Sequence, residues 1–426
     1  MSEADIPVRK RPTQAEVDLI CAKHDRLWQA RPGGARAVFA WMDLSGLDLR
    51  GRNLADADFT AACLIGTQLS SAKLDNATFF GADMQDVDLT NASLRRADLR
   101  GACLRGADLS GADMFEADLR EGAIAASDAK LGYRVLEARK RADTEAQGAN
   151  LSGANLQRSR LTGVIAIAAD FTDAVMKDCK LVRANLKQAS FKGADLAGAD
   201  LSGADLSGAD LSGAVLVGVK ATMWRTDGAN MEGTLTDTGS SAEPMASLPA
   251  ADMLRVHAQW CETGGREGQP SVFDGVDLRP LDSIAGLNLT ALSAKGAVFY
   301  GLDMEGVQLQ GAQLEGADLR SVNLRRADLR GARLAGARLN GSDLRDAQLG
   351  PLLLTADRLL PADLSGATLR GADLTGADMR RANLSQADLG RARLVDVQLR
   401  GADVTGTRLN NLRGMSAEQV LSLAEG

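Results

Sequence analysis

The amino-acid sequence predicts an all-β solenoid, in which the chain winds into four-sided coils and short helices cover the ends. Leu, Phe or Met recurs at every fifth residue over most of the chain, and Ala commonly stands two places earlier, as in Ala194-Asp195-Leu196-Ala197-Gly198. This period fits neither the 3.6-residue helix nor the two-residue alternation of a strand. Two inward and three outward residues form one side of a rectangle, so four sides make a coil of about 20 residues.

The residue types suit such a coil. A large apolar residue at each centre stacks on its counterpart one coil away, and a small residue two places earlier fills a narrow shaft that a larger one would overpack. Ala takes this second position at Ala97, Ala102, Ala107 and Ala112. Gly203 and Gly371 follow their centres, where a tight corner favours glycine. Cys179 stands in an Ala position and is expected to be a buried thiol.

The repeating order of a small residue, Asp or Asn, Leu or Phe, a polar residue and Gly resembles the pentapeptide-repeat family. The resemblance extends over most of the chain. It implies a right-handed quadrilateral β-helix, in which each coil contacts only its neighbours.

The phase of the repeat shows where the chain leaves the coil. Centres run at intervals of five from Leu44 to Leu119, with Ile124 as the expected last member. The next centre, Leu151, is out of step with them. We therefore expect a loop to leave the β-helix at about 125–148.

Two further runs of centres follow. One continues to Leu216 and fades near Met231, and the other begins at Phe273, takes up one extra residue, and holds its phase from Ile284 to Leu409. The segment between them is rich in Thr, Ser, Gly and Ala and is typical of a linker.

Helices are expected at the exposed ends of the solenoid. Thr13-Gln14-Ala15-Glu16 is typical of a capping box that opens a helix to Leu27 or Trp28, and residues 250–262 repeat its apolar spacing. A third helix starts at Ser416, with Val420, Leu421 and Leu423 expected to cover the last coil. The predicted domains are an N-terminal helical cap (1–40), a β-helix (41–236) interrupted at about 125–148, a linker (237–248), a second helical cap (249–272), a second β-helix (273–412) and a C-terminal capping helix (413–426).

No catalytic, cofactor-binding or metal-binding residues are expected. The only histidines, His24 and His257, lie in predicted helices beside Trp28 and Trp260, where a structural role is the simpler interpretation. The many carboxylates follow the repeat, and no phosphate loop, nucleophile elbow or metal-ligand cluster occurs. Five cysteines have no paired spacing, and no apolar stretch approaches the length of a membrane span. We therefore expect a non-enzymatic cytoplasmic protein without a membrane span.

The resemblance also implies a possible partner. Family members of the quinolone-resistance type engage DNA gyrase, some as rods whose charge imitates duplex DNA, which predicts a strongly acidic face. Here the net charge is only −7, and residues 320–413 hold 16 Arg and no Lys against 10 Asp and no Glu, a net charge of +6. We therefore expect a rigid scaffold or adaptor for protein partners, with modulation of DNA gyrase as the alternative. A homo-oligomer is compatible with both, whereas few aromatic residues accompany the arginines, which disfavours direct nucleic-acid binding.

Two surfaces of the coil attract attention. Stacking by 20 residues places Asp318, Arg338, Arg358 and Asp378 in a mixed column. It places Arg320, Asn340, Leu360, Arg380 and Arg400 in another. The first is typical of a solubilising ladder. The second is either another such ladder or an arginine stripe for an acidic partner.

The interruptions of the repeat are the other candidate sites. In the predicted loop, residues 131–141 suggest a short projecting helix with a basic end, and its candidate partner-binding residues are Tyr133, Arg134, Arg139, Lys140 and Arg141. A tolerated insertion is the alternative. Between Pro351 and Pro361 the phase is kept, but Leu353 and Leu360 point outward by the count. They indicate a partner contact, or else a surface that the preceding unit or a dimer partner covers. Phe80 and Phe115 also point outward by the count, and we expect each to pack on a neighbouring unit.

Overall fold

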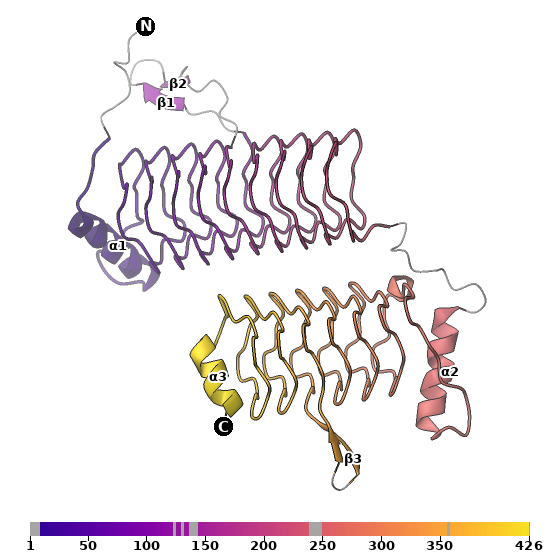
Figure 1. Cartoon of the computed structure of the whole chain (residues 1–426). Helices are drawn as coiled ribbons and strands as arrows, with labels where there is room; N and C mark the ends of the chain where they lie inside the picture. Colours follow the sequence, from indigo (N-terminus) through magenta and orange to yellow (C-terminus); the bar gives the residue numbers. More distant parts are fainter. Residues whose placement is uncertain are drawn as a thin grey trace. The chain divides into compact units, whose positions relative to one another are not determined.

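The computed structural model describes residues 9–121, 125–128, 132–135, 144–237, 249–355 and 358–425. The chain divides into two compact units, Met1–Thr238 and Gly239–Gly426, drawn from indigo to magenta and from salmon to yellow in Figure 1. The elements in chain order are α1 (Gln14–Trp28), β1 (Ala125–Asp128), β2 (Gly132–Val135), α2 (Ala250–Glu262), the 3₁₀ turn η2 (Arg279–Leu281), β3 (Leu352–Thr355), β4 (Arg358–Leu360) and α3 (Ala417–Glu425).

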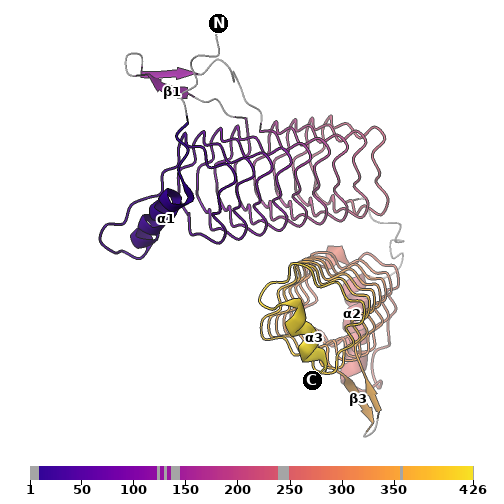
Figure 2. The same cartoon turned by 60° about the vertical axis from the view of Figure 1, so that its left-hand side comes forward.

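Each unit is a β-helix whose coils are joined by parallel bridges between residues 20 apart, such as Asp43 with Cys63 and Cys63 with Asp83. The Leu44 N–H donates to the Cys63 carbonyl at 2.8 Å, and the Cys63 N–H donates to the Met42 carbonyl at 2.8 Å. Because a corner follows every fifth residue, each side pairs through a single bridge rather than a long strand. The winding of both units is visible in Figures 1 and 2. The predicted β-helix is confirmed.

The interior is built from the two inward positions of each repeat. Phe39, Phe59 and Phe79 stack on successive coils with ring centroids 5.0 and 4.7 Å apart. The small residues expected in the shaft, Ala97, Ala102, Ala107 and Ala112, are fully buried. Cys179 is also fully buried, and burial raises the pKa of its thiol. The corner glycine Gly203 has a φ of +68°, which glycine adopts without strain.

In the first unit the coil resumes earlier than the repeat indicates. Cys103 pairs with Glu145, and Ala146 is the first buried centre after the interruption, one pentapeptide before Leu151. The buried Thr144 hydroxyl accepts the Gly101 N–H at 3.1 Å and donates to the Arg120 carbonyl at 3.0 Å. The predicted loop therefore extends too far at its C-terminal end. The sequence did not identify Ala146 as a centre, because centres are usually Leu, Phe or Met. Ile124 lies outside the described residues.

In the second unit the extra residue is found where the phase predicts it. Asp277 pairs with Val298, 21 residues on, whereas Ser283 pairs with Asp303 at the regular 20, and η2 takes up the difference. Residues 351–360, which we expected to remain in the coil, instead leave it, because Gln348 pairs with Asp378. Ten residues equal two pentapeptides, so the sequence keeps its phase across an excursion.

Three helices pack against these coils. At α1 the Thr13 N–H donates to Glu16 Oε2 at 2.8 Å and the Glu16 N–H donates to Thr13 Oγ1 at 3.3 Å, and Val17 and Cys21 join the first core. Leu254 of α2 and Val420 of α3 join the second core. In α3 the buried residues are Val420 and Ala424, one turn apart, whereas Leu421 and Leu423 are exposed, contrary to expectation.

Candidate interaction surfaces

The first excursion from the coil contains a β-hairpin. β1 and β2 pair antiparallel, with Ala126 opposite Arg134 and Ser127 opposite Tyr133. The expected projecting helix is wrong over these residues, and pairing with β1 satisfies backbone groups that a helix would have bonded internally. The backbone places Tyr133 and Arg134 on β2, while Arg139, Lys140 and Arg141 lie outside the described residues. Their part in binding a partner stays a prediction.

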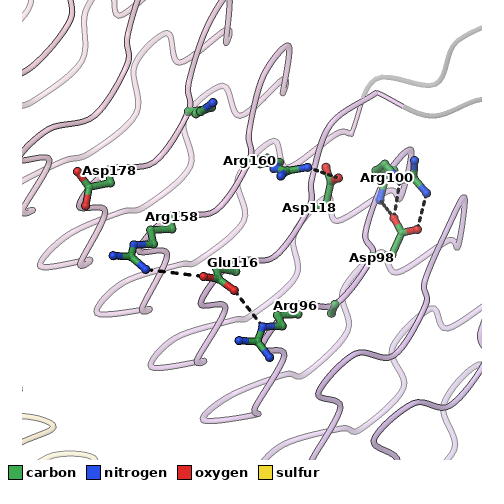
Figure 3. Close-up of a pocket in the computed structure, with 10 residues that line it drawn as sticks. Arg96, Asp98, Arg100, Glu116, Asp118, Arg158, Arg160 and Asp178 are labelled. Carbon is green, nitrogen blue, oxygen red and sulfur yellow. Dashed lines mark hydrogen bonds and ion pairs between the residues drawn. The ribbon is translucent and has the colours of Figure 1, made fainter.

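A charged groove of about 560 Å³ runs along the face of the first unit (Figure 3). Glu116 lies between two arginines of neighbouring coils, with its Oε2 2.9 Å from Arg96 Nε and its Oε1 3.9 Å from Arg158 Nη1. Burial acts to raise the pKa of Asp118, but hydrogen bonds from Arg120 outweigh it and lower the pKa. Asp118 is therefore held ionised and supplies no acid or base near neutral pH. The alternating charges order this surface.

Most arginines that directly follow a centre are neutralised by an Asp that directly precedes the same centre. In each Asp-apolar-Arg triplet the guanidinium turns back on the Asp carboxylate, with Nη2 to Oδ2 distances of 2.5–2.7 Å. The pairs are Asp48–Arg50, Asp98–Arg100, Asp118–Arg120, Asp277–Arg279, Asp318–Arg320, Asp328–Arg330, Asp343–Arg345 and Asp378–Arg380. Because both charges are satisfied within one side of the coil, an excess of arginine in the sequence does not mean an equally basic surface.

The expected arginine stripe is divided between two columns. The ten-residue excursion shifts the register, so Arg338 is bridged to Thr368 rather than stacked on Arg358. Arg320 consequently shares a column with Asn340 and Arg370, as shown by the Ser321 and Gly341 N–H groups donating to the carbonyls of Asn340 and Arg370. Arg380 and Arg400 form a different column, in which the Arg381 N–H donates to the Arg400 carbonyl at 3.0 Å.

The second excursion is the hairpin formed by β3 and β4, which projects from the second unit in Figures 1 and 2. Leu353 is 62% exposed, as expected from the count, and it pairs across the hairpin with Leu359, which is 42% exposed. Leu360, which was also expected to point outward, is instead half-buried, because it faces the coil beside Gly331. The leucines therefore divide between the two faces of the hairpin.

Phe80 and Phe115 are half-buried by arginines of their own unit. The Arg100 guanidinium carbon lies 5.2 Å from the Phe80 ring centroid, and those of Arg95 and Arg158 lie 4.9 and 6.0 Å from that of Phe115. These cation–π contacts cover part of each ring. The expectation that both rings need a neighbouring unit is thus unnecessary.

Both histidines join a helix to the first coil of its unit. His24 and His257 are buried, and their Nδ1 atoms accept the N–H of Ala37 at 3.0 Å and of Ser271 at 2.9 Å. The proton of His257 is then on Nε2, which donates to the Thr290 carbonyl at 3.1 Å. Burial lowers the pKa of both rings. They are neutral structural groups, as the sequence indicated.

Across the described parts of the chain, no group of three or more His, Cys, Asp or Glu residues is placed to hold a metal ion. No described helix is long and apolar enough to cross a membrane.

Sequence reasoning did not select three exposed residues near the second excursion as candidates for partner binding: Leu359, Arg358 and Arg381. The available signal was the pair Pro351 and Pro361, which bounds a segment of ten residues without the Ala-x-Leu pattern. Proline at both limits of a run that equals two repeats indicates an inserted hairpin, which keeps the phase.

Comparison with known proteins supports the architecture. The model of the family described as pentapeptide repeats (8 copies) matches this chain over ten ranges, some of which overlap. The matched residues are 35–70, 53–91, 72–111, 92–122, 143–178, 179–218, 285–320, 323–350, 362–394 and 377–413. Among proteins of curated function, none matches the chain in sequence.

Several solved structures are similar. HetL, described as a pentapeptide repeat protein involved in heterocyst differentiation regulation in the cyanobacterium Nostoc, is 23% identical, with 91% of this chain and 92% of HetL covered and a TM-score of 0.15. Rfr23 from the cyanobacterium Cyanothece is 27% identical over 33% of this chain and 91% of its own, with a TM-score of 0.19. QnrB1, described as a plasmid-mediated fluoroquinolone resistance protein, is 19% identical over 48% and 87%, with a TM-score of 0.20.

Proposed function

Because this chain belongs to the family of pentapeptide-repeat proteins, we propose that it is a non-enzymatic, rigid scaffold or adaptor that binds other proteins through the surface of its right-handed quadrilateral β-helices. One observation carries this proposal. The described chain departs from the regular coil through two hairpins, β1–β2 and β3–β4, and the second exposes leucines to solvent. Exposed loops on a stiff frame are common sites of recognition.

The helices α1, α2 and α3 have a supporting role in this proposal. Each contributes buried residues to the core of its unit at a terminal coil, as Val17, Leu254 and Val420 do. Covering a terminal coil removes apolar surface and unpaired backbone groups from solvent, which prevents non-specific end-to-end association. The helices would thereby keep recognition on the sides of the β-helix.

The pairing of charges disfavours the alternative, modulation of DNA gyrase by imitation of duplex DNA. That mechanism needs a continuous acidic face. Here many of the aspartates are bound by the arginine two residues later, and Glu116 is bound between Arg96 and Arg158. Alternating charges of this kind suit a solvated scaffold better than a mimic of a polyanion.

The proposal is tested by affinity capture with the full chain as bait, followed by identification of bound proteins. We expect a specific protein that is lost with Leu353→Asp combined with Leu359→Asp, or with deletion of residues 122–143. Leu421→Asp, at an exposed leucine of α3, is the matched control and should leave capture unchanged. Absence of a specific partner would contradict the scaffold, and inhibition of gyrase supercoiling by the purified protein would favour the alternative.

A further inference from the structure

The hairpin β3–β4 is apolar on both of its faces. Leu352 and Leu360 form a cross-strand pair that faces the coil, and Leu353 and Leu359 form the next pair, on the opposite face. Leu354 is also exposed, at 45%. A two-stranded hairpin that only had to shield its own coil would carry polar residues on the outer face. The outer leucines therefore indicate a surface that becomes covered.

The coil holds the base of the hairpin in place. Gly331 lies so close under it that a Cβ there would come within 2.9 Å of Leu352 Cβ and 3.1 Å of Leu360 Cδ2. A Cβ at Gly311, one coil earlier in the same corner column, would lie 3.9 Å from Leu352 Cδ2. The inner face is thus packed on two successive coils, and the outer face is presented in one orientation.

Unneutralised arginines lie at the same corner of the β-helix. The column that contains Gly331 continues after the hairpin to Arg381 and Gly401, because Leu334 N–H bonds to Asp363 and Arg381 N–H to Arg400. Arg381 and Arg400 are exposed, and neither forms an ion pair with a described residue. Arg358 adds an exposed guanidinium on β4. This corner therefore differs from the self-paired Asp-apolar-Arg sides elsewhere.

We propose that the hairpin edge, which we define as Leu353, Leu354, Leu359, Arg358, Arg381 and Arg400, binds a segment of a partner protein that carries leucine-like side chains beside carboxylates. This inference rests on the proposed scaffold function and names the chemistry of its partner. The outer leucines bury apolar side chains of the partner, and guanidinium groups at the rim form bidentate contacts with its carboxylates. The arginines also determine the sign of the charge that the edge accepts.

The test uses the full-length protein and a fluorescein-labelled synthetic peptide built from Glu and Leu, with fluorescence anisotropy as the readout. Two matched peptides replace every Glu by Lys or every Leu by Ser. We expect the Glu–Leu peptide to bind at least about tenfold more tightly than either of them. Leu353→Ser with Leu359→Ser, and separately Arg381→Glu with Arg400→Glu, should each weaken its binding by about tenfold or more.

Two control variants carry the same chemistry on other surfaces. Leu421→Ser changes an exposed leucine of α3, and Arg393→Glu changes an exposed arginine that forms no ion pair with a described residue. Both should bind the Glu–Leu peptide as the parent does. Circular dichroism of every variant must show the parent β-signal, so that lost binding is not lost folding.

Several results would overturn the proposal. Equal binding of the three peptides, or binding unchanged by the hairpin-edge substitutions, would show that this edge does not select acidic, apolar segments. Loss of self-association in the hairpin-edge variants would identify a second copy of this chain as the occupant instead. Binding to phosphatidylserine vesicles that the same substitutions abolish would identify a membrane. If the captured partner is retained by the hairpin-edge variants and lost on deleting 122–143, the scaffold stands and this site is wrong.

Discussion

The Asp318–Arg320 pair offers a direct measurement of what burial does to an ion pair of fixed geometry. Arg320 Nη2 and Nε lie 2.6 and 2.8 Å from the Asp318 carboxylate oxygens, and Arg338 Nη2 lies 3.1 Å away. The side chains of Asp318 and Arg320 are 1% and 5% exposed. Ten residues later, Asp328 and Arg330 repeat the geometry with distances of 2.6 and 2.9 Å, but with 15% and 41% exposure.

We expect Asp318→Ala to destabilise the second unit by about 3–5 kcal/mol, because it removes the carboxylate that is paired with the buried Arg320 guanidinium. Asp328→Ala should cost no more than about 1 kcal/mol, since Arg330 can be solvated. Burial acts to raise the pKa of Asp318, but Arg320 and Arg338 outweigh it and hold the pKa below 3.8. The contribution of this carboxylate is therefore fully present above pH 3.8 and is lost as the pH falls through the lowered value.

The assay is urea unfolding of the full chain at neutral pH, followed by circular dichroism. The two units can unfold in separate transitions, so each is fitted by itself, and the transition of the first unit is an internal reference that neither substitution should move. Equal losses for Asp318→Ala and Asp328→Ala would refute the reasoning, because geometry alone would then determine the energy. Asp318→Asn, which keeps the volume, separates loss of charge from loss of packing.

Three further predictions test other parts of the structure. Because burial lowers the pKa of His257 below 6.5, the second unit should lose stability as the pH falls from about 7.5 to about 5.5. His257→Phe should remove this pH dependence and cost about 1–3 kcal/mol at neutral pH, because it leaves the Ser271 N–H unpaired. If the urea midpoint of the variant depends on pH as that of the parent does, the assignment to His257 is wrong. Ala102→Leu should destabilise the first unit by about 1–3 kcal/mol by overpacking the shaft, whereas Arg105→Leu on the surface of the same coil should leave the midpoint unchanged. Deleting residues 122–143 should preserve the β-signal and melting temperature, because Glu145 would then pair with Cys103 at the regular spacing, and a large fall in melting temperature would show that the excursion supports the coil.

Much of the fold could be read from local pattern. Leu44 and its counterparts at every fifth position are buried because the pentapeptide itself separates inward from outward side chains. The Thr13–Glu16 box precedes α1 because its two hydrogen bonds involve residues only three positions apart. Phase counting also located the extra residue at η2, since a shift by one changes which residues face inward.

The candidate site was less accessible to the sequence. The exposed Leu353 followed from the count, but its partner Leu359 depended on strand pairing within a hairpin that the unbroken phase concealed. The prediction of a single arginine stripe was wrong for the same reason. Two residues share a column only if the chain between them makes whole coils, and the hairpin adds residues that are not part of any coil. Likewise, Ala146 was overlooked as a centre because its burial comes from its place in the resumed coil.

The sequence by itself determined that this chain forms coils. In each repeat the apolar and small residues define the two inward positions, and the residues after them permit a corner after every fifth residue. Only the tertiary structure decided which side chains become neighbours between coils. An excursion of ten residues equals two repeats, so it leaves the five-residue pattern of the sequence unchanged. It nevertheless separates Arg320 from Arg380 and places Arg381 below the projecting leucines. Burial, too, is a property of the assembled face: Asp318 and Asp328 stand in the same local pattern, and their surroundings alone make one pair buried and the other solvated.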